Sequence, residues 1–183
     1  MSLFTAIQSI TGNSALNSLM VFSAKYLVLV VPVSLIYLWI SKRDENGRSD
    51  SLFSFFNVLL GLVISYIIGI FYFHGTPYMQ GFDTILTDAA ENSFPSQHTT
   101  VVFSLVWSLV YKQRKKLSWI AGSAAVLTGF ARIYTGLHFP IDIIGGIGAS
   151  VLGFLISLCL EGYMKRISEF IEALEERILS RLQ

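Results

Sequence analysis

Two short segments of the chain carry side chains that are suited to handling a phosphate group. In the first, residues 131–142, Arg132 precedes His138 by six positions, and Asp142 follows that histidine by four. A guanidinium binds phosphate oxygens in pairs, and a carboxylate beside an imidazole fixes its tautomer and frees the other ring nitrogen to attack or to accept a proton. These residues predict the rim of an anion site. The alternative is structural: a helix-capping aspartate, a snorkelling arginine and a surface histidine.

The second segment, residues 93–100, opens a predicted helix and contains Ser96 and His98. Backbone N–H groups at a helix start have no partner within the helix, and the helix dipole is positive there, so a phosphate can rest on them. The Ser96 hydroxyl would add a donor, and His98 would stand over the same pocket. Taken alone, the segment also fits an ordinary helix that starts at Pro95 and places its histidine in a headgroup region.

The composition of the 183 residues indicates a membrane protein. Charged residues make up 14% of the chain and hydrophobic residues 53%, whereas an ordinary soluble domain has about 25% charged residues. The single cysteine, Cys159, excludes a disulfide-stapled fold, and the net charge of +1 gives no basic footprint for nucleic acid. We therefore expect the bilayer and a lipid as partners and no nucleic acid, with the oligomeric state left open.

Hydrophobic stretches separated by short polar loops predict an all-α integral membrane protein, a bundle of five transmembrane helices. About 20 apolar residues cross the roughly 30 Å hydrocarbon core as a helix. The third stretch is shorter, and we expect its helix to start upstream, near Asn92 or Ser93. Gly136 is placed to end the fourth helix and Pro140 to start the fifth. The predicted spans are Leu19–Ile40, Leu52–Phe73, Ser96–Tyr111, Leu117–Gly136 and Ile141–Leu160.

Two segments flank the predicted spans. Residues 1–18 carry no charge and place apolar side chains at helical spacing before Thr11-Gly12-Asn13 breaks the pattern, so we expect an interfacial or partly inserted helix that is not removed as a signal. Residues 161–183 alternate acids and bases around apolar positions, which predicts an amphipathic helix on the membrane surface. The predicted organisation is a membrane-embedded domain over 1–160 and a cytoplasmic helix over 161–183.

The basic residues give the expected orientation of the bundle. With five crossings, all but two of the thirteen Lys and Arg residues fall in the loops and the tail on one side, which the positive-inside rule makes cytoplasmic. The other two, Lys25 and Arg132, lie within predicted spans, where charged groups are functional candidates. All three histidines, at positions 74, 98 and 138, lie on or next to the opposite side. The site is therefore expected to face the periplasm or cell exterior.

The two phosphate-handling segments together resemble a known family. Pro95-Ser96-Gln97-His98, and the pattern Ala131-Arg132, five residues, His138, three residues, Asp142, resemble the second and third signature motifs of the type 2 phosphatidic acid phosphatase superfamily of integral-membrane lipid phosphatases. Ala131 stands where the family usually has serine. The run from Asp88 to Thr100 and the opening Leu3–Ile7 are most similar to the bacitracin-resistance type of undecaprenyl pyrophosphate phosphatase. The resemblance covers roughly residues 3–153.

This resemblance implies a mechanism that runs through a phosphohistidine and needs no metal or cofactor. His138 would attack phosphorus, Asp142 would orient and charge-balance its ring, and His98 would protonate the departing lipid phosphate. Arg132, Ser96 and the amides at the helix start would hold the transferring group. The implied reaction is hydrolysis of undecaprenyl pyrophosphate to undecaprenyl phosphate and phosphate at a bacterial plasma membrane, in lipid carrier recycling and bacitracin resistance.

Two departures from the family pattern bear on phosphate binding. In the first signature motif, Gly69 stands where the family has lysine and Thr76 where it has arginine. Loss of the arginine removes a charge-assisted hydrogen bond worth roughly 1.5 to 3 kcal/mol, and His74 and Lys25 are candidate replacements. Gln97 stands where the family has glycine or aspartate, and its amide could donate to phosphate.

Three alternatives remain open from the residues alone. The same side chains would serve a phosphatase for another lipid phosphate, such as phosphatidylglycerol phosphate, phosphatidic acid or lipid A. The loss of the arginine at Thr76 is also compatible with a non-catalytic lipid-binding membrane protein. The third alternative is a metal-dependent hydrolase that uses the three histidines and Asp142.

Overall fold

The computed structural model describes residues 2–41, 46–87 and 91–181, and most of these residues are helical. Within this part of the chain the only β pairing is an isolated antiparallel bridge between Gly75 and Asn92. The predicted all-α class is confirmed. The elements in chain order are α1 (Leu3–Gln8), α2 (Ser14–Tyr26), η1 (Leu27–Leu29), α3 (Val30–Ile40), α4 (Gly47–Phe71), α5 (Gln97–Tyr111), α6 (Lys115–Tyr134) and α7 (Pro140–Arg181).

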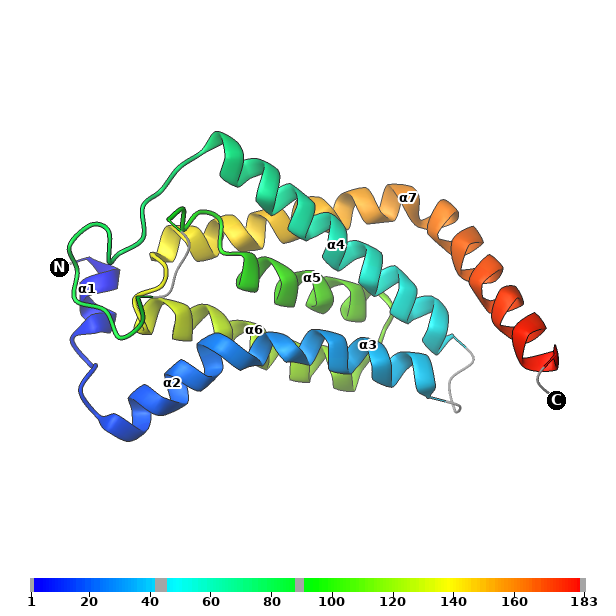
Figure 1. Ribbon diagram of the computed structural model, residues 1–183, viewed down its shortest axis with the longest axis horizontal. Coiled ribbons are helices and arrows are strands. Elements are labelled where there is room, and N and C mark those ends of the chain that lie inside the picture. Colours follow the sequence, from blue (N-terminus) through cyan, green and yellow to red (C-terminus); the bar gives the residue numbers. More distant parts are fainter. Residues whose placement is uncertain (1, 42–45, 88–90, 182–183) are drawn as a thin grey trace.

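The helices form an elongated bundle with α5 at its centre (Figure 1). α5 packs against α4, α6 and α7, and α4 packs along α7. Val102, Leu105 and Leu109 of α5 are completely buried. Exposed apolar side chains such as Ile36 of α3 and Ile67 of α4 lie on the outer surface of the bundle. An apolar exterior of this kind marks a surface that contacts lipid.

Among the residues that the structure describes, three continuous helical segments are long and apolar enough to cross a membrane: Ser14–Ile40, Gly47–Phe71 and Pro140–Ile171. They overlap the first, second and fifth predicted spans. The first begins at Ser14 rather than at Leu19, because the Asn13 side chain accepts a hydrogen bond from the Leu16 N–H (3.0 Å) and caps the helix. Helices α5 and α6 occupy the third and fourth predicted spans, and α5 has 15 residues, so the count of five crossings stays a prediction.

The predicted start of the third helix, near Asn92 or Ser93, is wrong. Helix α5 begins at Gln97. Asn92 and Ser93 are held upstream in an extended segment, because their side chains bond to the backbone N–H and carbonyl of His74. The same side chains therefore cannot cap the helix.

Three other predicted signals at helix ends agree with the structure, although α4 (Gly47–Phe71) and α6 (Lys115–Tyr134) begin and end a few residues from their predicted bounds. Residues 9–13 separate α1 from α2, as the Thr11-Gly12-Asn13 break predicts, and Gly136 follows α6 with φ +78°, the left-handed conformation that favours glycine. Pro140 is the first residue of α7. Helix α7 runs unbroken to Arg181, so no helix break marks the predicted domain boundary at residues 160–161, and that boundary stays a prediction.

Helices α4 and α7 approach closely because glycines face each other in their contact. A Cβ atom on Gly153 would lie 2.7 Å from the backbone nitrogen and 2.8 Å from the Cα of Gly61. Next to this contact, Asn57 of α4 donates to the Ser104 carbonyl and the Ser108 hydroxyl of α5 and accepts from Ser157 of α7. The interior thus combines close backbone packing with a satisfied buried amide, both of which fix how α4, α5 and α7 are arranged.

This packing gives a test with a matched control on the same helix. We expect Gly153→Ala to destabilise the protein by about 1–3 kcal/mol, because the added methyl group meets backbone atoms that cannot move aside. Gly148→Ala should be neutral or stabilising, because Gly148 is exposed and has no neighbouring atom within 4 Å of the added carbon. Thermal unfolding of both variants in detergent provides the measurement. Equal melting temperatures would contradict the close contact between α4 and α7.

Candidate active site

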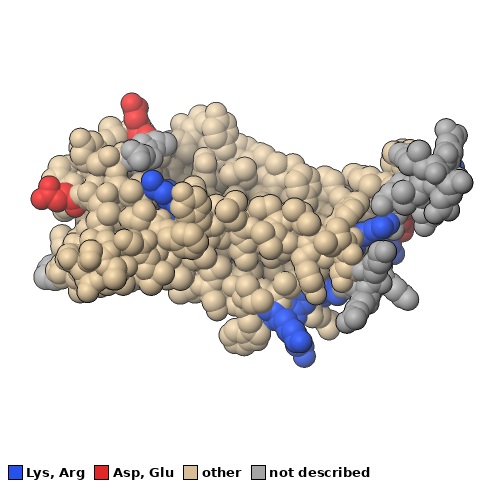
Figure 2. Space-filling model, turned by 60° about the horizontal axis from the view of Figure 1, so that its bottom comes forward, with Lys and Arg blue, Asp and Glu red and all other residues tan. Residues whose placement is uncertain are grey.

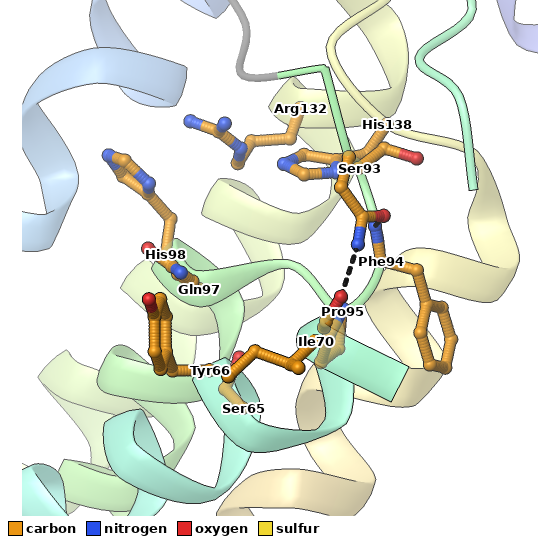
Figure 3. Close-up of a pocket in the computed structure, with 12 residues that line it drawn as sticks. Ser65, Tyr66, Ile70, Ser93, Phe94, Pro95, Gln97, His98, Arg132 and His138 are labelled. Carbon is orange, nitrogen blue, oxygen red and sulfur yellow. Dashed lines mark hydrogen bonds between the residues drawn. The ribbon is translucent and has the colours of Figure 1, made fainter. Parts of the chain in front are cut away.

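A cavity of about 380 Å³ opens at one end of the bundle, where the 72–96 segment, the start of α5 and the turn between α6 and α7 meet. Figure 3 shows His98, Arg132 and His138 at this cavity together with Tyr66 and Ile70 of α4. Polar and apolar side chains thus share the lining. The lining residues are Ser65, Tyr66, Gly69, Ile70, Asn92, Ser93, Phe94, Pro95, Gln97, His98, Arg132 and His138.

The turn between α6 and α7 brings Arg132 and His138 to the same cavity. The backbone N–H groups of Leu137 and His138 both donate to the Arg132 carbonyl, at 3.0 and 3.2 Å. Gly136 permits this tight reversal through its positive φ, and a Cβ atom there would collide with Thr84. This chain reversal explains how Arg132 and His138, six positions apart in the sequence, come to line the same cavity.

Arg132 is nearly buried and only partly satisfied. Arg132 is 9% exposed, and one terminal nitrogen of its guanidinium donates to the Ala24 carbonyl of α2 at 3.2 Å. Its Nε has no hydrogen-bond partner among the described residues. A buried donor without an acceptor is unfavourable, and an anion in the cavity would supply one.

Asp142 lies behind the cavity, completely buried, and contacts two imidazoles. His74 Nδ1 is 2.7 Å from Oδ1, whereas His138 Nδ1 is 3.6 Å from Oδ2, too long for a hydrogen bond. The Phe139 N–H donates to Oδ2 at 2.8 Å. The predicted neighbourhood of His138 and Asp142 therefore exists, but the shorter bond goes to His74.

His138 is held in its neutral form by its surroundings. The residue is 7% exposed, and this burial lowers the pKa of the His138 imidazole. The Arg132 guanidinium lowers it further, and the Asp142 carboxylate opposes both effects. A neutral imidazole has a free lone pair, which is the form that can act as a nucleophile.

The start of α5 presents Gln97 and His98 to the cavity and keeps Ser96 behind it. The Ser96 N–H donates to the Asp142 carbonyl at 3.0 Å, and its hydroxyl accepts from the Thr99 hydroxyl at 3.0 Å. Ser96 is completely buried, whereas Gln97 is exposed and His98 half-buried. The free N–H groups in the first turn of α5 face the same end of the bundle.

The remaining sequence-predicted residues lie outside the cavity lining. Thr76 is buried, and its hydroxyl accepts from the Met79 N–H at 3.4 Å. Lys25 is exposed on α2. His74 contacts Asp142, and neither of these two residues is among those that line the cavity. The structure thus brings Gln97, His98, Arg132 and His138 around one space, and sets Asp142, His74 and Ser96 behind it.

Sequence reasoning missed Asn92, which organises the loop beside the cavity. Its amide nitrogen donates to the carbonyls of Gly69 and Tyr72, at 2.8 and 2.9 Å, and its oxygen accepts from the N–H groups of His74 and Phe94. One side chain therefore ties the end of α4 to the segment before α5. An asparagine at this position signals a turn, but its distant partners follow only from the fold.

The donor set favours anion binding over metal binding. Within residues 2–41, 46–87 and 91–181, no group of three or more His, Cys, Asp or Glu side chains is placed to hold a metal ion. The cavity instead combines an arginine, two imidazoles, an amide and the start of a helix, all of which can donate hydrogen bonds to phosphate oxygens. Such an arrangement can bind a phosphoryl group and transfer it.

Comparisons with known proteins agree with this chemistry. The model of the PAP2 superfamily matches residues 72–166, which contain every lining residue outside α4. The chain is similar to the undecaprenyl-diphosphatase BcrC of Bacillus subtilis strain 168, with 30% identity over 98% of this chain and 93% of that protein. A putative undecaprenyl-diphosphatase, YbjG of Escherichia coli K12, is 31% identical over 85% of this chain and 79% of its own length.

Among solved structures, the crystal structure of Aquifex aeolicus LpxE is similar, with a TM-score of 0.72, 26% identity and coverage of 85% of this chain and 92% of that one. The fold, the cavity and the family match point to the same class of protein. The chain belongs to the PAP2 superfamily and is a membrane lipid phosphatase of that type.

Proposed function

We propose that the protein hydrolyses undecaprenyl pyrophosphate to undecaprenyl phosphate and inorganic phosphate, and so recycles this lipid carrier and confers bacitracin resistance. The observation that carries the proposal is the buried Arg132, whose Nε has no acceptor in the part of the chain that the structure describes, at a cavity that it shares with His98 and His138. Support for the substrate comes from BcrC and YbjG, whose names state this activity. The similarity to BcrC extends over nearly the full length of both chains.

In the proposed reaction His138 is the nucleophile and His98 the general acid. The neutral Nε2 of His138 attacks the terminal phosphorus, and a P–N bond forms while the P–O bond to the bridging oxygen breaks. His98 transfers a proton to that oxygen as the lipid phosphate leaves. Water then attacks the phosphohistidine, gives its proton to His98 and releases phosphate. Asp142 stabilises the positive charge that His138 carries in the intermediate.

Phosphoryl transfer depends mainly on positioning and on neutralising the oxygens of the transferring group. Arg132 supplies the fixed positive charge, and the amide of Gln97 and the first N–H groups of α5 supply further donors beside His98. The buried Thr76 lies outside the lining, so it does not replace the arginine that the family has in its first motif. In the proposal these donors act without a metal ion.

The wall of the cavity on α4 suits a lipid substrate. Tyr66 and Ile70 line the cavity and are 62% and 63% exposed on the side of the bundle. A pyrophosphate can thus occupy the polar end while the prenyl chain stays against the apolar outer surface of α4. The acidic residues Asp83 and Glu91 in the segment before α5 would repel a free anion, but a substrate that enters from the bilayer does not depend on long-range electrostatic attraction.

The charge distribution supports a site that faces the periplasm or the cell exterior. Figure 2 shows most of the visible Lys and Arg side chains toward one end of the molecule and acidic side chains at the other. The basic end includes Arg114, paired with Asp50 (2.7 Å), and Lys112, paired with Glu161 (2.8 Å). The cavity lies at the opposite end of α5, and the positive-inside rule makes the basic end cytoplasmic.

Replacement of the nucleophile tests the proposed chemistry. We expect His138→Ala to lower turnover by about 10³-fold or more, because removal of a covalent nucleophile leaves only binding and electrostatic assistance. Phosphate release from undecaprenyl pyrophosphate in detergent gives the rate. In the wild-type protein, a covalently bound phosphate that is stable in base and lost in acid identifies a phosphohistidine. A wild-type rate of phosphate release in the variant would exclude His138 as the nucleophile.

A panel of lipids tests the proposed substrate separately. Undecaprenyl pyrophosphate, phosphatidylglycerol phosphate, phosphatidic acid and lipid A are given to the same purified protein. We expect kcat/KM to be highest for undecaprenyl pyrophosphate. A higher kcat/KM for one of the other lipids would identify that lipid as the preferred substrate and would leave the proposed catalytic residues unchanged.

The pH dependence reports the state of His138. Because burial and Arg132 lower its pKa, the imidazole stays neutral as the pH falls through about 6.5, the ordinary value for histidine. We therefore expect the rate of phosphoenzyme formation at pH 6.5 to be no lower than at neutral pH, and to decrease only at lower pH. Rapid-quench measurements between pH 4.5 and pH 8 provide the profile. If the rate falls to half its maximum before the decreasing pH reaches 7, a neutral, buried nucleophile is contradicted.

A further inference from the structure

His74 makes the shortest side-chain contact of the buried carboxylate, yet the proposed mechanism gives it no task. Its Nδ1 lies 2.7 Å from Asp142 Oδ1, whereas the nucleophile His138 is 3.6 Å from Oδ2. His74 is also outside the set of residues that line the cavity. The carboxylate that should orient the nucleophile is thus itself held by a different histidine.

The backbone of His74 is fixed on both sides of its side chain. Its N–H donates to Asn92 Oδ1 at 3.0 Å. Its carbonyl accepts from both the backbone N–H and the hydroxyl of Ser93, at 2.8 and 2.7 Å. Its ring also packs against Phe139, with 5.1 Å between ring centroids. With the backbone bonded and the ring packed, Nδ1 has a defined position relative to Asp142.

Asp142 has a donor on each oxygen before His138 engages it. His74 occupies Oδ1, and the Phe139 N–H occupies Oδ2 at 2.8 Å. A completely buried carboxylate needs such donors to remain ionised. His138 Nδ1 lies 3.6 Å from Oδ2 and has no hydrogen-bond partner within the described segments of the chain. The carboxylate is therefore oriented in advance, and the remaining gap to the nucleophile closes with little rearrangement.

We propose that His74 is a positioning residue that acts on His138 through Asp142. Its Nδ1–H anchors Oδ1, so that Oδ2 is directed at the Nδ1–H of His138 when that ring becomes positively charged in the phosphohistidine. The proposal rests on the phosphohistidine mechanism above. In this role His74 contacts the carboxylate and not the phosphate, which differs from its expected use as a replacement for the arginine absent at Thr76.

Three substitutions at position 74 separate the two roles. His74→Phe keeps an aromatic ring against Phe139 and removes both ring nitrogens. His74→Asn places an amide N–H near the position of Nδ1, where it can still donate to Asp142. His74→Gln places its amide farther out, near the position of Nε2. The full-length variants are purified in detergent, their unfolding temperatures are recorded, and kcat and KM are measured on whichever panel lipid the wild-type protein hydrolyses fastest.

We expect His74→Phe to lower kcat about 10- to 100-fold, the usual effect of removing a residue that orients a functional imidazole, with little change in KM. His74→Asn should recover most of this loss, and His74→Gln should not. If the Phe variant does not fold, the comparison between Asn and Gln decides the question by itself. A purely structural role would show as a lower unfolding temperature without this pattern in kcat.

Two results would overturn the proposal. One is a wild-type kcat in a folded His74→Phe variant. The other is a rise in KM that Gln corrects and Asn does not, which would assign His74 a phosphate contact through Nε2. Failure of the phosphohistidine mechanism has a different signature, because His138→Ala would then retain turnover. A change of preferred lipid alters the proposed substrate and leaves the comparison at position 74 intact.

Discussion

The buried carboxylate of Asp142 connects the segments that form the site. Its oxygens accept from the side chain of His74 and the N–H of Phe139, and its backbone carbonyl accepts from the N–H of Ser96. The loop after α4, the start of α5 and the turn before α7 therefore meet at one residue. A buried negative charge is stable only when donors such as these surround it. The three segments that supply the donors must therefore come together for the Asp142 carboxylate to be stable.

The positive side of the site has the opposite property, since it is incomplete in the protein alone. Arg132 and His138 are buried, and neither Nε of Arg132 nor Nδ1 of His138 has a hydrogen-bond partner among residues 2–41, 46–87 and 91–181. In the proposed reaction a phosphate group between them would satisfy the arginine, and a phosphorylated imidazole would gain the carboxylate as its partner. Stabilisation thus arises where charge develops during phosphoryl transfer, which is how electrostatic catalysis works.

The sequence predicts the parts of this structure that depend on local patterns. Apolar stretches predict the helical class, and Gly136 and Pro140 predict a helix end and a helix start because their conformational limits act on the residues beside them. The start of α5 was predicted wrongly, because Asn92 and Ser93 could cap a helix but bond instead to His74, a residue distant in sequence. Local pattern carries no information about that competition.

The candidate site shows the same division. The spacing of Arg132, His138 and Asp142 predicts their proximity, because they lie at the end of α6, in the turn that follows it and at the start of α7. The contact of His74 with Asp142 crosses 68 positions of the chain, and no periodicity or motif indicates it. The four bonds of Asn92 likewise join segments that meet only in the folded bundle. Motifs therefore identify which chemistry is present, and the fold decides which residues support it.

The most direct test of the account is an experimental structure of the full-length protein with orthovanadate, which imitates a phosphoryl group during transfer. We expect vanadium within bonding distance of His138 Nε2, vanadate oxygens bonded to Arg132 and to the first N–H groups of α5, and the ring of His98 beside the opposite, leaving-group oxygen. Vanadate bound at another place, or bound in this cavity without contact to His138 and Arg132, would contradict the account.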